Sequence, residues 1–228
     1  MDARQGPRAR RGWSQESGHT VDRVMDYILE RIHSGEYGQG EQIVARTIAK
    51  DIDLSVAPVR EAIHRLSGEG VIELFSNRSA RVRQLSIEDI LDALEVWEVH
   101  AGLTARLVAE RIKIRDNSAK FRKVAEALQK SSASGDKTGY YRHLVRFQEV
   151  MSEIADNPYV DAVRKRLHTE FWTQQLSAHL PSELWADYFV SFERILPAIL
   201  SGDPKKAEKA YSSHIHWVAE VLRDSASG

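Results

Sequence analysis

The chain has 228 residues, with 32 Lys and Arg against 33 Asp and Glu, and no cysteine. A chain of this length can bury a hydrophobic core and fits one or two domains. The missing cysteines exclude disulfides, thiolate zinc sites and a cysteine nucleophile. The formal net charge of −1 argues against a protein that coats nucleic acid through bulk basicity, but not against a local basic patch.

The sequence predicts neither a membrane segment nor a secretory signal. No run of 18 apolar residues occurs, and the N-terminus lacks the apolar core of a signal peptide. We therefore expect a cytoplasmic protein with no membrane partner. Residues 1–19 are rich in Gly, Ser, Gln and Arg, which predicts a disordered basic arm. Such an arm either touches DNA phosphates or is a solvated tail.

Residues 20–85 contain the pattern of three short helices followed by a hairpin. The first helix begins at Thr20, carries an apolar face and stops at residues 34–35; that face comprises Val21, Val24, Met25, Ile28, Leu29 and Ile32. A second helix is expected over residues 44–51. A third is expected over residues 56–69, with Ser55 as its N-cap and Pro58 in its first turn, where a missing N–H costs nothing.

Residues 71–75 and 80–83 predict two strands joined by a turn at 76–79. Three helices and a hairpin in this order are typical of a winged helix-turn-helix. Polar side chains of the third helix are then free to enter a DNA major groove, and basic residues at the hairpin can reach phosphates. These side chains are Arg60, His64 and Arg65 on the helix and Arg78, Arg81 and Arg83 at the hairpin. The alternative is that they are ordinary solvated charges.

Residues 86–224 contain only helical patterns. A polar capping box at Ser86 and Asp89 opens a long helix to about residue 112. Further helices follow over about 118–130, 138–155, 159–178, 181–199 and 204–221, and Pro197 should kink the fifth of the six. The sequence thus predicts a mostly α protein, with a winged helix-turn-helix and a small β-hairpin wing followed by an all-α bundle of six to seven helices.

One segment carries a specific family signature. Residues 55–72, SVAPVREAIHRLSGEGVI, resemble the signature of GntR-family bacterial transcription regulators, which has a capping Ser or Thr, a Pro-Val-Arg-Glu-Ala core and a Glu-Gly-Leu-Val end. The Gly40-Glu41-Gln42-Ile43 segment also resembles the Pro-Gly-x-x-Leu turn of that family, without its Pro. Two positions depart from the pattern. Val56 stands where the family usually has Arg, and Asn77 where the wing tip usually has Gly.

The resemblance implies a role in DNA binding for six residues. Arg60 would read or clamp DNA from the recognition helix, and Arg46 would contact the backbone from the preceding helix. Ser55 would bind a phosphate through its hydroxyl or backbone N–H at the helix N-terminus. The wing tip would consist of Ser76, Asn77 and Arg78.

The second half resembles the helical FCD effector domain of the FadR-type subgroup. The matching stretches are residues 86–111, 147–160 and 195–214, including the segment Asn157-Pro158-Tyr159-Val160. The resemblance implies an effector-binding and dimerisation domain over residues 86–224. Many members bind a divalent metal and a small organic acid within this bundle, through an Asp, a His four residues later and two further His.

This sequence lacks most of those metal ligands at the corresponding positions. The Asp position is Leu144, the first His position is Gln148 and the second is Phe192, so that only His214 matches. Trp97 stands where an Arg often holds the organic acid. Carbon side chains cannot bind a metal, and a Gln carbonyl is a weak zinc ligand. We therefore expect no metal and no cofactor, unless Glu95, Glu98 or His143 rebuilds a site.

The residues that replace the metal site leave two interpretations open. Trp97, Leu144, Gln148, Phe192 and His214 either line a pocket for an apolar or aromatic effector, oriented by Gln148 and His214, or form a filled core in which His214 is a hydrogen-bonded core histidine. A kink at Pro197 would open space beside Phe192.

The sequence as a whole predicts a transcription regulator that acts as a repressor and binds a palindromic operator as a homodimer. A small-molecule effector would shift the spacing of the two DNA-binding domains. The alternatives are a regulator that has lost its effector, and an enzyme with a DNA-binding appendage. The enzyme lacks support because the chain has no His-Glu-x-x-His, Gly-rich phosphate loop or Gly-x-Ser-x-Gly motif.

Charge also restricts the expected mode of DNA binding. Residues 1–85 hold 13 Lys or Arg and 12 Asp or Glu, so the DNA-binding half is nearly neutral. Affinity must therefore come from a few placed arginines and from dimerisation rather than from a broad basic field.

Overall fold

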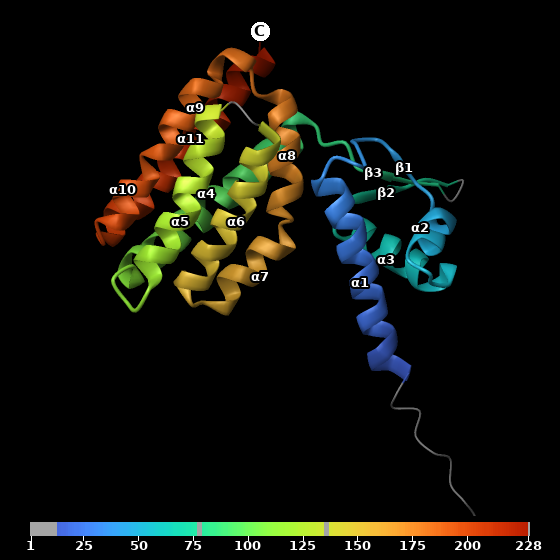
Figure 1. Ribbon diagram of the computed structural model, residues 1–228. Coiled ribbons are helices and arrows are strands. Elements are labelled where there is room, and N and C mark those ends of the chain that lie inside the picture. Colours follow the sequence, from blue (N-terminus) through green and yellow to red (C-terminus); the bar gives the residue numbers. More distant parts are fainter. Residues whose placement is uncertain (1–12, 77–78, 135–136, 228) are drawn as a thin grey trace, which may run out of the picture. The chain divides into compact units, whose positions relative to one another are not determined.

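A computed structural model of the chain describes residues 13–76, 79–134 and 137–227. It consists of two compact units, Met1–Gln84 and Leu85–Gly228, each with its own core (Figure 1). The boundary expected from the sequence lies one residue later, after Leu85. In the described residues, no helix is both long and apolar enough to cross a membrane.

The first unit is a three-helix domain with a small sheet. Its elements are α1 (Trp13–His33), β1 (Gln42–Ile43), α2 (Ala45–Asp51), α3 (Val56–Gly68), β2 (Ile72–Leu74) and β3 (Ala80–Val82). The strands form one antiparallel sheet in the order β1-β3-β2, with Ile72 opposite Val82 and Gln42 opposite Arg81. This is the predicted winged helix-turn-helix, with β1 as a third strand that the sequence analysis did not include.

Apolar spacing in the sequence explains how this unit packs. Val21, Val24, Ile28 and Ile32 of α1 are buried, as are Val59, Ala62, Ile63 and Leu66 of α3, and the two helices pack on each other. Gly70 follows α3 with φ of 77°, a conformation that glycine adopts without strain. The chain therefore turns directly from the recognition helix into β2.

The predicted N-terminal arm is corrected by α1. This helix begins at Trp13, seven residues before Thr20, so residues 13–19 are helical and not a disordered arm. Residues 1–12 lie outside the described part of the chain. The helix continues through Gly18, which weakens a helix without ending it, so no N-cap is needed at Thr20.

The second unit is the predicted helical bundle, with more helices than expected. Its elements are α4 (Ile87–Arg111), α5 (Asn117–Ser134), α6 (Lys137–Ala155), α7 (Pro158–Arg166), α8 (Thr169–His179), η1 (Ser182–Leu184), α9 (Trp185–Glu193), α10 (Ile195–Leu200) and α11 (Pro204–Ser227). The loop expected at residues 131–135 is helical as far as Ser134. The predicted capping box opens α4: Asp89 N–H donates to Ser86 Oγ, and Ser86 N–H donates to Asp89 Oδ2.

The larger number of helices arises because two predicted helices are each divided. The helix expected over 159–178 is interrupted by His168, whose φ is 45°. Buried Arg164 of α7 bridges this break, since it pairs with Asp161 of α7 and with Glu170 of α8. The helix expected over 181–199 is interrupted at Arg194, which lies between α9 and α10. Pro197 then lies in the first turn of α10, where its missing N–H is not required.

A close approach of α4 and α11 organises the bundle. Among the described elements, these two helices have the most extensive contact with each other. Gly102 of α4 lies at the contact: a Cβ there would come within 2.3 Å of Ser212 Oγ and 3.6 Å of the Glu208 backbone oxygen. The absence of a side chain at residue 102 therefore sets the distance between the two helices.

We expect Gly102→Val to destabilise the second unit by about 1–3 kcal/mol, because its γ-methyl groups extend toward the α11 backbone. Differential scanning calorimetry should show a fall in Tm of roughly 2–4 °C per kcal/mol. The control is Gly102→Ala combined with Ser212→Ala, which removes the nearest atom and adds helix propensity. This control should melt at or above the wild-type temperature, and a loss equal to that of Gly102→Val would refute the steric explanation.

Candidate nucleic-acid interface and interior cavity

The recognition helix α3 presents its N-terminal end and one polar face to solvent. Ser55 is the N-cap residue with extended backbone, and its side chain makes no capping hydrogen bond. Both Ser55 and Arg60 are exposed. Because the first backbone N–H groups of a helix have no intrahelical acceptor, the start of α3 can receive an anionic oxygen.

A groove lies between the start of α2, the polar face of α3 and the strands. This α2–α3 groove has a volume of about 530 Å³ and is lined by Gln42, Ile43, Val44, Ala45, Arg46, Arg60, Ile63, His64, Leu74, Phe75, Ser79 and Ala80. It brings together two of the predicted DNA-binding residues, Arg46 and Arg60. His64 joins them because it follows Arg60 by four residues, one helical turn later on the same face.

Among the basic residues of α3, Arg65 has a structural role. Its guanidinium donates to Glu61 Oε1 at 2.7 Å and to Asp22 Oδ1 of α1 at 3.3 Å. From the sequence, Arg65 is expected on a DNA-facing surface with Arg60 and His64. The structure instead places it against α1, because Arg65 lies five residues after Arg60 and so points to a different side of the helix.

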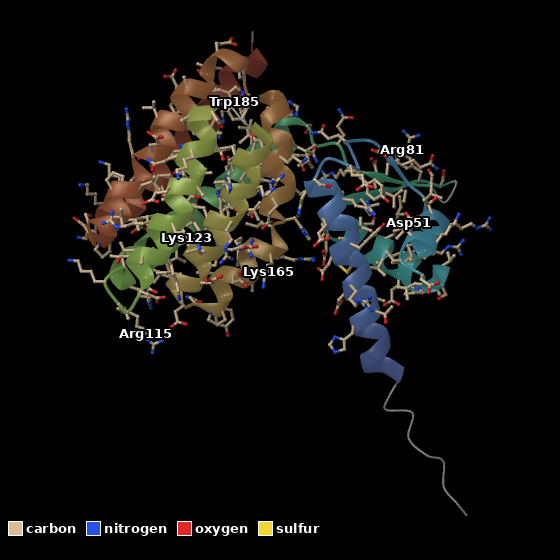
Figure 2. All side chains as sticks on the ribbon, viewed as in Figure 1. Asp51, Arg81, Arg115, Lys123, Lys165 and Trp185 are labelled. Atoms are coloured by element: carbon tan, nitrogen blue, oxygen red, sulfur yellow. The ribbon has the colours of Figure 1, made fainter. Side chains whose placement is uncertain are left out.

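The wing is only partly described. Ser76 is exposed after the end of β2, whereas Asn77 and Arg78 lie outside the described residues. Arg81 is exposed on β3 (Figure 2), and its guanidinium carbon lies 5.7 Å from the centre of the Phe75 ring. Ser55 and Ser76 do not line the α2–α3 groove, so of the four predicted DNA-binding residues that the structure describes, the groove joins Arg46 and Arg60.

Exposed apolar residues beside these cations were not foreseen from the sequence. Val44, Leu74 and Phe75 have exposed fractions of 44%, 39% and 42%, and all three line the α2–α3 groove. Residues 71–75 do not alternate between apolar and polar side chains. Because successive side chains of a strand point to opposite faces, this was the available signal that an apolar side chain would face solvent. A surface that combines guanidinium groups with apolar contacts suits a DNA backbone and base edges.

The second unit brings the five predicted effector residues together in its interior. One cavity between α4, α6, α8, α9 and α11 is lined by all five, which we name the core cluster: Trp97, Leu144, Gln148, Phe192 and His214. The cavity volume is about 20 Å³, enough for one water molecule. All five side chains are buried, and Trp97 stacks on His100 at 4.7 Å between ring centres. The geometry is therefore that of a filled core.

The polar groups of the core cluster already have partners. Thr169 Oγ1 donates to Gln148 Oε1 at 3.2 Å, and His214 Nδ1 lies 2.7 Å from Ser191 Oγ. Burial lowers the pKa of His214 to about 3 and raises the pKa of Tyr188 to about 12. Both groups are neutral at physiological pH, so the interior offers no charge that would balance the carboxylate of an organic acid.

The residues at the family's metal positions do not fit a metal ion. Leu144 and Phe192 have no donor atom, and the Gln148 oxygen accepts from Thr169. Of the alternatives, Glu95 pairs with Arg223, Glu98 with His216, and His143 with Ser131. The described residues contain no group of three or more His, Cys, Asp or Glu that could hold a metal.

The depressed pKa of His214 predicts a dependence of stability on pH. The imidazole takes up a proton at about pH 6.5 in the unfolded chain but at about pH 3 in the folded one. Acidification therefore favours unfolding: the contribution is intact above pH 6.5 and is lost as the pH falls toward 3. We expect a loss of about 2 kcal/mol by pH 5 from this residue.

Chemical denaturation between pH 7.5 and pH 5, followed by far-UV circular dichroism, measures this loss. His214→Gln keeps a hydrogen-bonding group near Ser191 but does not titrate. The stability of this variant should fall less steeply than that of the wild type below pH 6.5. Parallel curves would show that His214 is not buried as a neutral group.

Comparisons with known proteins find matches to both halves of the chain. The family model "Bacterial regulatory proteins, gntR family" matches residues 20–82, and the model "FCD domain" matches residues 89–216. The "Probable D-xylose utilization operon transcriptional repressor" of Paenarthrobacter nicotinovorans is 27% identical over 197 residues, which cover 86% of this chain and 85% of the repressor. The "HTH-type transcriptional repressor NanR" of Citrobacter rodentium is 28% identical over 216 residues, covering 86% of this chain and 82% of NanR.

A solved structure agrees in fold. The structure titled "E. coli McbR/YncC" aligns with a TM-score of 0.71, at 16% sequence identity, over 91% of this chain and 98% of that protein. At this identity the similarity supports the fold alone.

Proposed function

Since the chain belongs to the GntR family of bacterial regulatory proteins and carries an FCD domain, we propose that it is a repressor that binds a palindromic operator as a homodimer and responds to a small-molecule effector. The observation that carries the DNA-binding part is the α2–α3 groove, in which Arg46 and Arg60 converge beside the exposed face of α3. The two repressor relatives support the direction of control. A DNA partner also implies that the protein works in the cytoplasm.

In this proposal α3 lies in the major groove. Arg60 donates two hydrogen bonds to a guanine edge, which is the commonest specific contact of an arginine. Val56, half-buried in the first turn of the helix, contributes an apolar contact such as that with a thymine methyl group. Specificity then depends on Arg60 more strongly than in relatives with a second arginine at position 56.

Phosphate contacts fix the position of α3 in the groove. Arg46 reaches the backbone from α2, and Ser55 binds a phosphate through its unengaged hydroxyl at the start of α3. Ser76, Asn77 and Arg78 contact DNA from the wing. Arg81 extends this surface along β3.

The second copy docks on an exposed stripe of α4. Val96 and Val99 have exposed fractions of 51% and 73%, and Leu103 continues the same face one turn later. In an antiparallel pairing about a two-fold axis at Val99, residues at equal distances on either side face each other. Asp92 of each copy then faces Arg106 of the other. The stripe therefore offers apolar contacts and also pairs opposite charges between the two copies.

Effector control is the remaining part of the proposal. An effector bound to the second unit shifts the populations of two dimer states that differ in the spacing of their recognition helices. The core cluster accepts an organic molecule only if its side chains move, because the cavity holds about one water. A regulator without an effector is the second candidate, and the small cavity is the observation that favours it.

Selection from a random DNA library, followed by gel-shift titration, tests the proposal. We expect enrichment of a palindrome whose half-site centres are one helical turn apart, about 10 base pairs. The affinity should fall steeply with salt concentration, because bound arginines release counterions from DNA. Enrichment of no sequence, or of a single half-site, would refute dimeric operator binding.

A further inference from the structure

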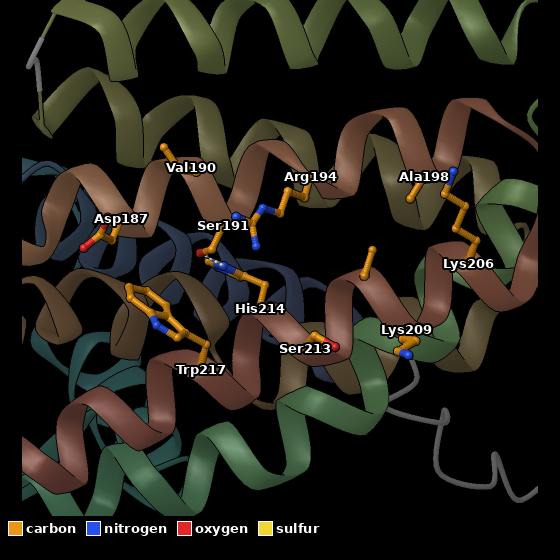
Figure 3. Close-up of a pocket in the computed structure, with 11 residues that line it drawn as sticks. Asp187, Val190, Ser191, Arg194, Ala198, Lys206, Lys209, Ser213, His214 and Trp217 are labelled. Atoms are coloured by element: carbon orange, nitrogen blue, oxygen red, sulfur yellow. Dashed lines mark hydrogen bonds between the residues drawn. The ribbon is translucent and has the colours of Figure 1, made fainter.

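A second, larger hollow lies on the outside of the helical bundle. This α9–α11 groove has a volume of about 670 Å³ and is formed by α9, Arg194, α10 and α11 (Figure 3). Its lining residues are Asp187, Val190, Ser191, Arg194, Ala198, Lys206, Lys209, Ala210, Ser213, His214 and Trp217. The volume falls within the range of pockets that hold small organic ligands.

The polar part of the groove is cationic. Arg194, Lys206 and Lys209 are exposed, and none of the three forms an ion pair with another residue in the described part of the chain. Asp187 is the single carboxylate among the lining residues. Figure 3 shows the Arg194 guanidinium directed toward Ser191 and His214, with Lys206 extending toward Ala198 farther along the groove. Three positive groups against one negative group favour an anionic ligand.

The position of Arg194 follows from the division of the predicted fifth helix. Arg194 joins the end of α9 to the start of α10, so its side chain leaves the helix at the bend and lies over the groove. Lys206 and Lys209 lie three residues apart on α11 and therefore share one face of that helix. The three cations thus reach the groove from both of its walls.

The remaining lining is apolar and aromatic. Val190 has an exposed fraction of 52%, and Trp217, Ala198 and Ala210 extend the apolar surface. A planar ring can lie on the indole of Trp217, and a carboxylate or phosphate attached to it can reach the cations. Arg194 offers the planar fork that binds such groups through two hydrogen bonds.

We propose that the α9–α11 groove binds a small organic anion that has a carboxylate or phosphate group and a planar apolar body. The interior cavity lacks both the room and the charge for this ligand, whereas the groove has both. As an effector site the groove rests on the proposed function, but anion binding in itself does not.

One side chain connects the α9–α11 groove with the interior cavity. His214 lines both the α9–α11 groove and the interior cavity, and its Nδ1 lies 2.7 Å from Ser191 Oγ. A ligand that displaces this pair moves a side chain of α11, the helix that packs along α4. Because α4 carries the proposed dimer stripe, the groove is connected to the interface by two helices in contact.

Isothermal titration of the full-length protein with 2-naphthoate and with 2-naphthyl phosphate tests the site. We expect saturable binding of at least one of these anions, and none of the neutral 2-naphthylmethanol up to its solubility limit. The anion that binds more tightly identifies the acidic group of the ligand. Failure of both anions to saturate, or equal binding of the neutral compound, would overturn the proposal.

Variants locate the binding. Arg194→Gln combined with Lys209→Gln should weaken anion binding at least about tenfold, and Trp217→Leu should weaken it without changing the preference for anions. Lys205→Gln is the matched control, because Lys205 is an exposed lysine of α11 that does not line the groove. Equal effects of the control and of the double variant would place the anion elsewhere. Circular dichroism confirms that each variant is folded.

A DNA measurement separates this proposal from the proposed function. The double variant at positions 194 and 209 should bind operator DNA like the wild type when no anion is present. Arg60→Ala should bind naphthoate like the wild type even though it loses the operator. Loss of anion binding in Arg60→Ala would contradict a site confined to the second unit, whereas failure of operator binding in every protein would refute only the proposed function.

Discussion

Replacement of Arg60 by alanine is expected to lower operator affinity roughly 30-fold or more. A bidentate arginine contact to guanine contributes about 1–3 kcal/mol, and a dimer makes two of them. Arg60 is exposed on α3, and the described residues provide it with no ion pair. Its removal therefore costs little folding stability. Gel-shift titration with the operator and with scrambled DNA should show that the specific complex weakens while the non-specific one changes little.

Arg65→Ala is the matched control on the same helix. Arg65 pairs with Glu61 and Asp22, so its loss should leave operator affinity within about threefold and reduce stability by at most about 1 kcal/mol, the range of exposed ion pairs. Arg46→Ala should weaken all DNA binding evenly and reduce the salt dependence by about one unit per half-site. If Arg60→Ala kept the preference for operator over scrambled DNA, α3 would not be the reading element.

The elements that the sequence predicted well are those that local chemistry determines. The apolar spacing of residues 56–69 places α3, and the reciprocal bonds of Ser86 and Asp89 start α4 where the capping box does. The two-residue strand β1 was missed because its only support is pairing with β3, which lies about 40 residues later. Such a contact has no local signal in the sequence.

The breaks in the helices of the bundle also depend on contacts that the local sequence pattern does not show. His168 adopts a left-handed conformation that a non-glycine residue rarely takes. Two contacts flank this break: Arg164 pairs with Glu170 across it, and Thr169 bonds to Gln148 of α6, which lies outside the segment. The local pattern of residues 159–178 therefore predicts one continuous helix, and tertiary contacts divide it.

The two hollows of the second unit also differ in how much of them the sequence predicted. The five residues of the core cluster line one cavity, and the family resemblance had assigned them to facing helix positions. The size of their cavity depends on how the neighbouring rings pack, which the sequence does not contain. The α9–α11 groove was missed because Arg194 precedes α10 and Lys206 lies 12 residues later on α11, and only the turn after α10 brings them to opposite walls of one hollow.

The second large effect is expected at the proposed dimer stripe. Val99→Arg places two like charges at the two-fold axis, where an apolar side chain with 73% exposure lies in the single chain. Like charges that face each other across an interface cost several kcal/mol. Sedimentation velocity at micromolar concentration should therefore show a monomer for the variant and a dimer for the wild type. Since the two half-sites are then no longer linked, operator affinity should fall about 10²-fold or more.

Ile114→Arg separates this effect from general surface damage. Ile114 is another exposed apolar residue of the second unit, with 52% exposure, but it follows the end of α4 and is outside the stripe. This control should remain dimeric and bind the operator normally. Asp92→Arg should weaken the dimer, and adding Arg106→Asp should restore part of the loss, because the two positions face each other across the axis. A dimer that survives Val99→Arg unchanged would exclude the α4 stripe as the contact between the two copies.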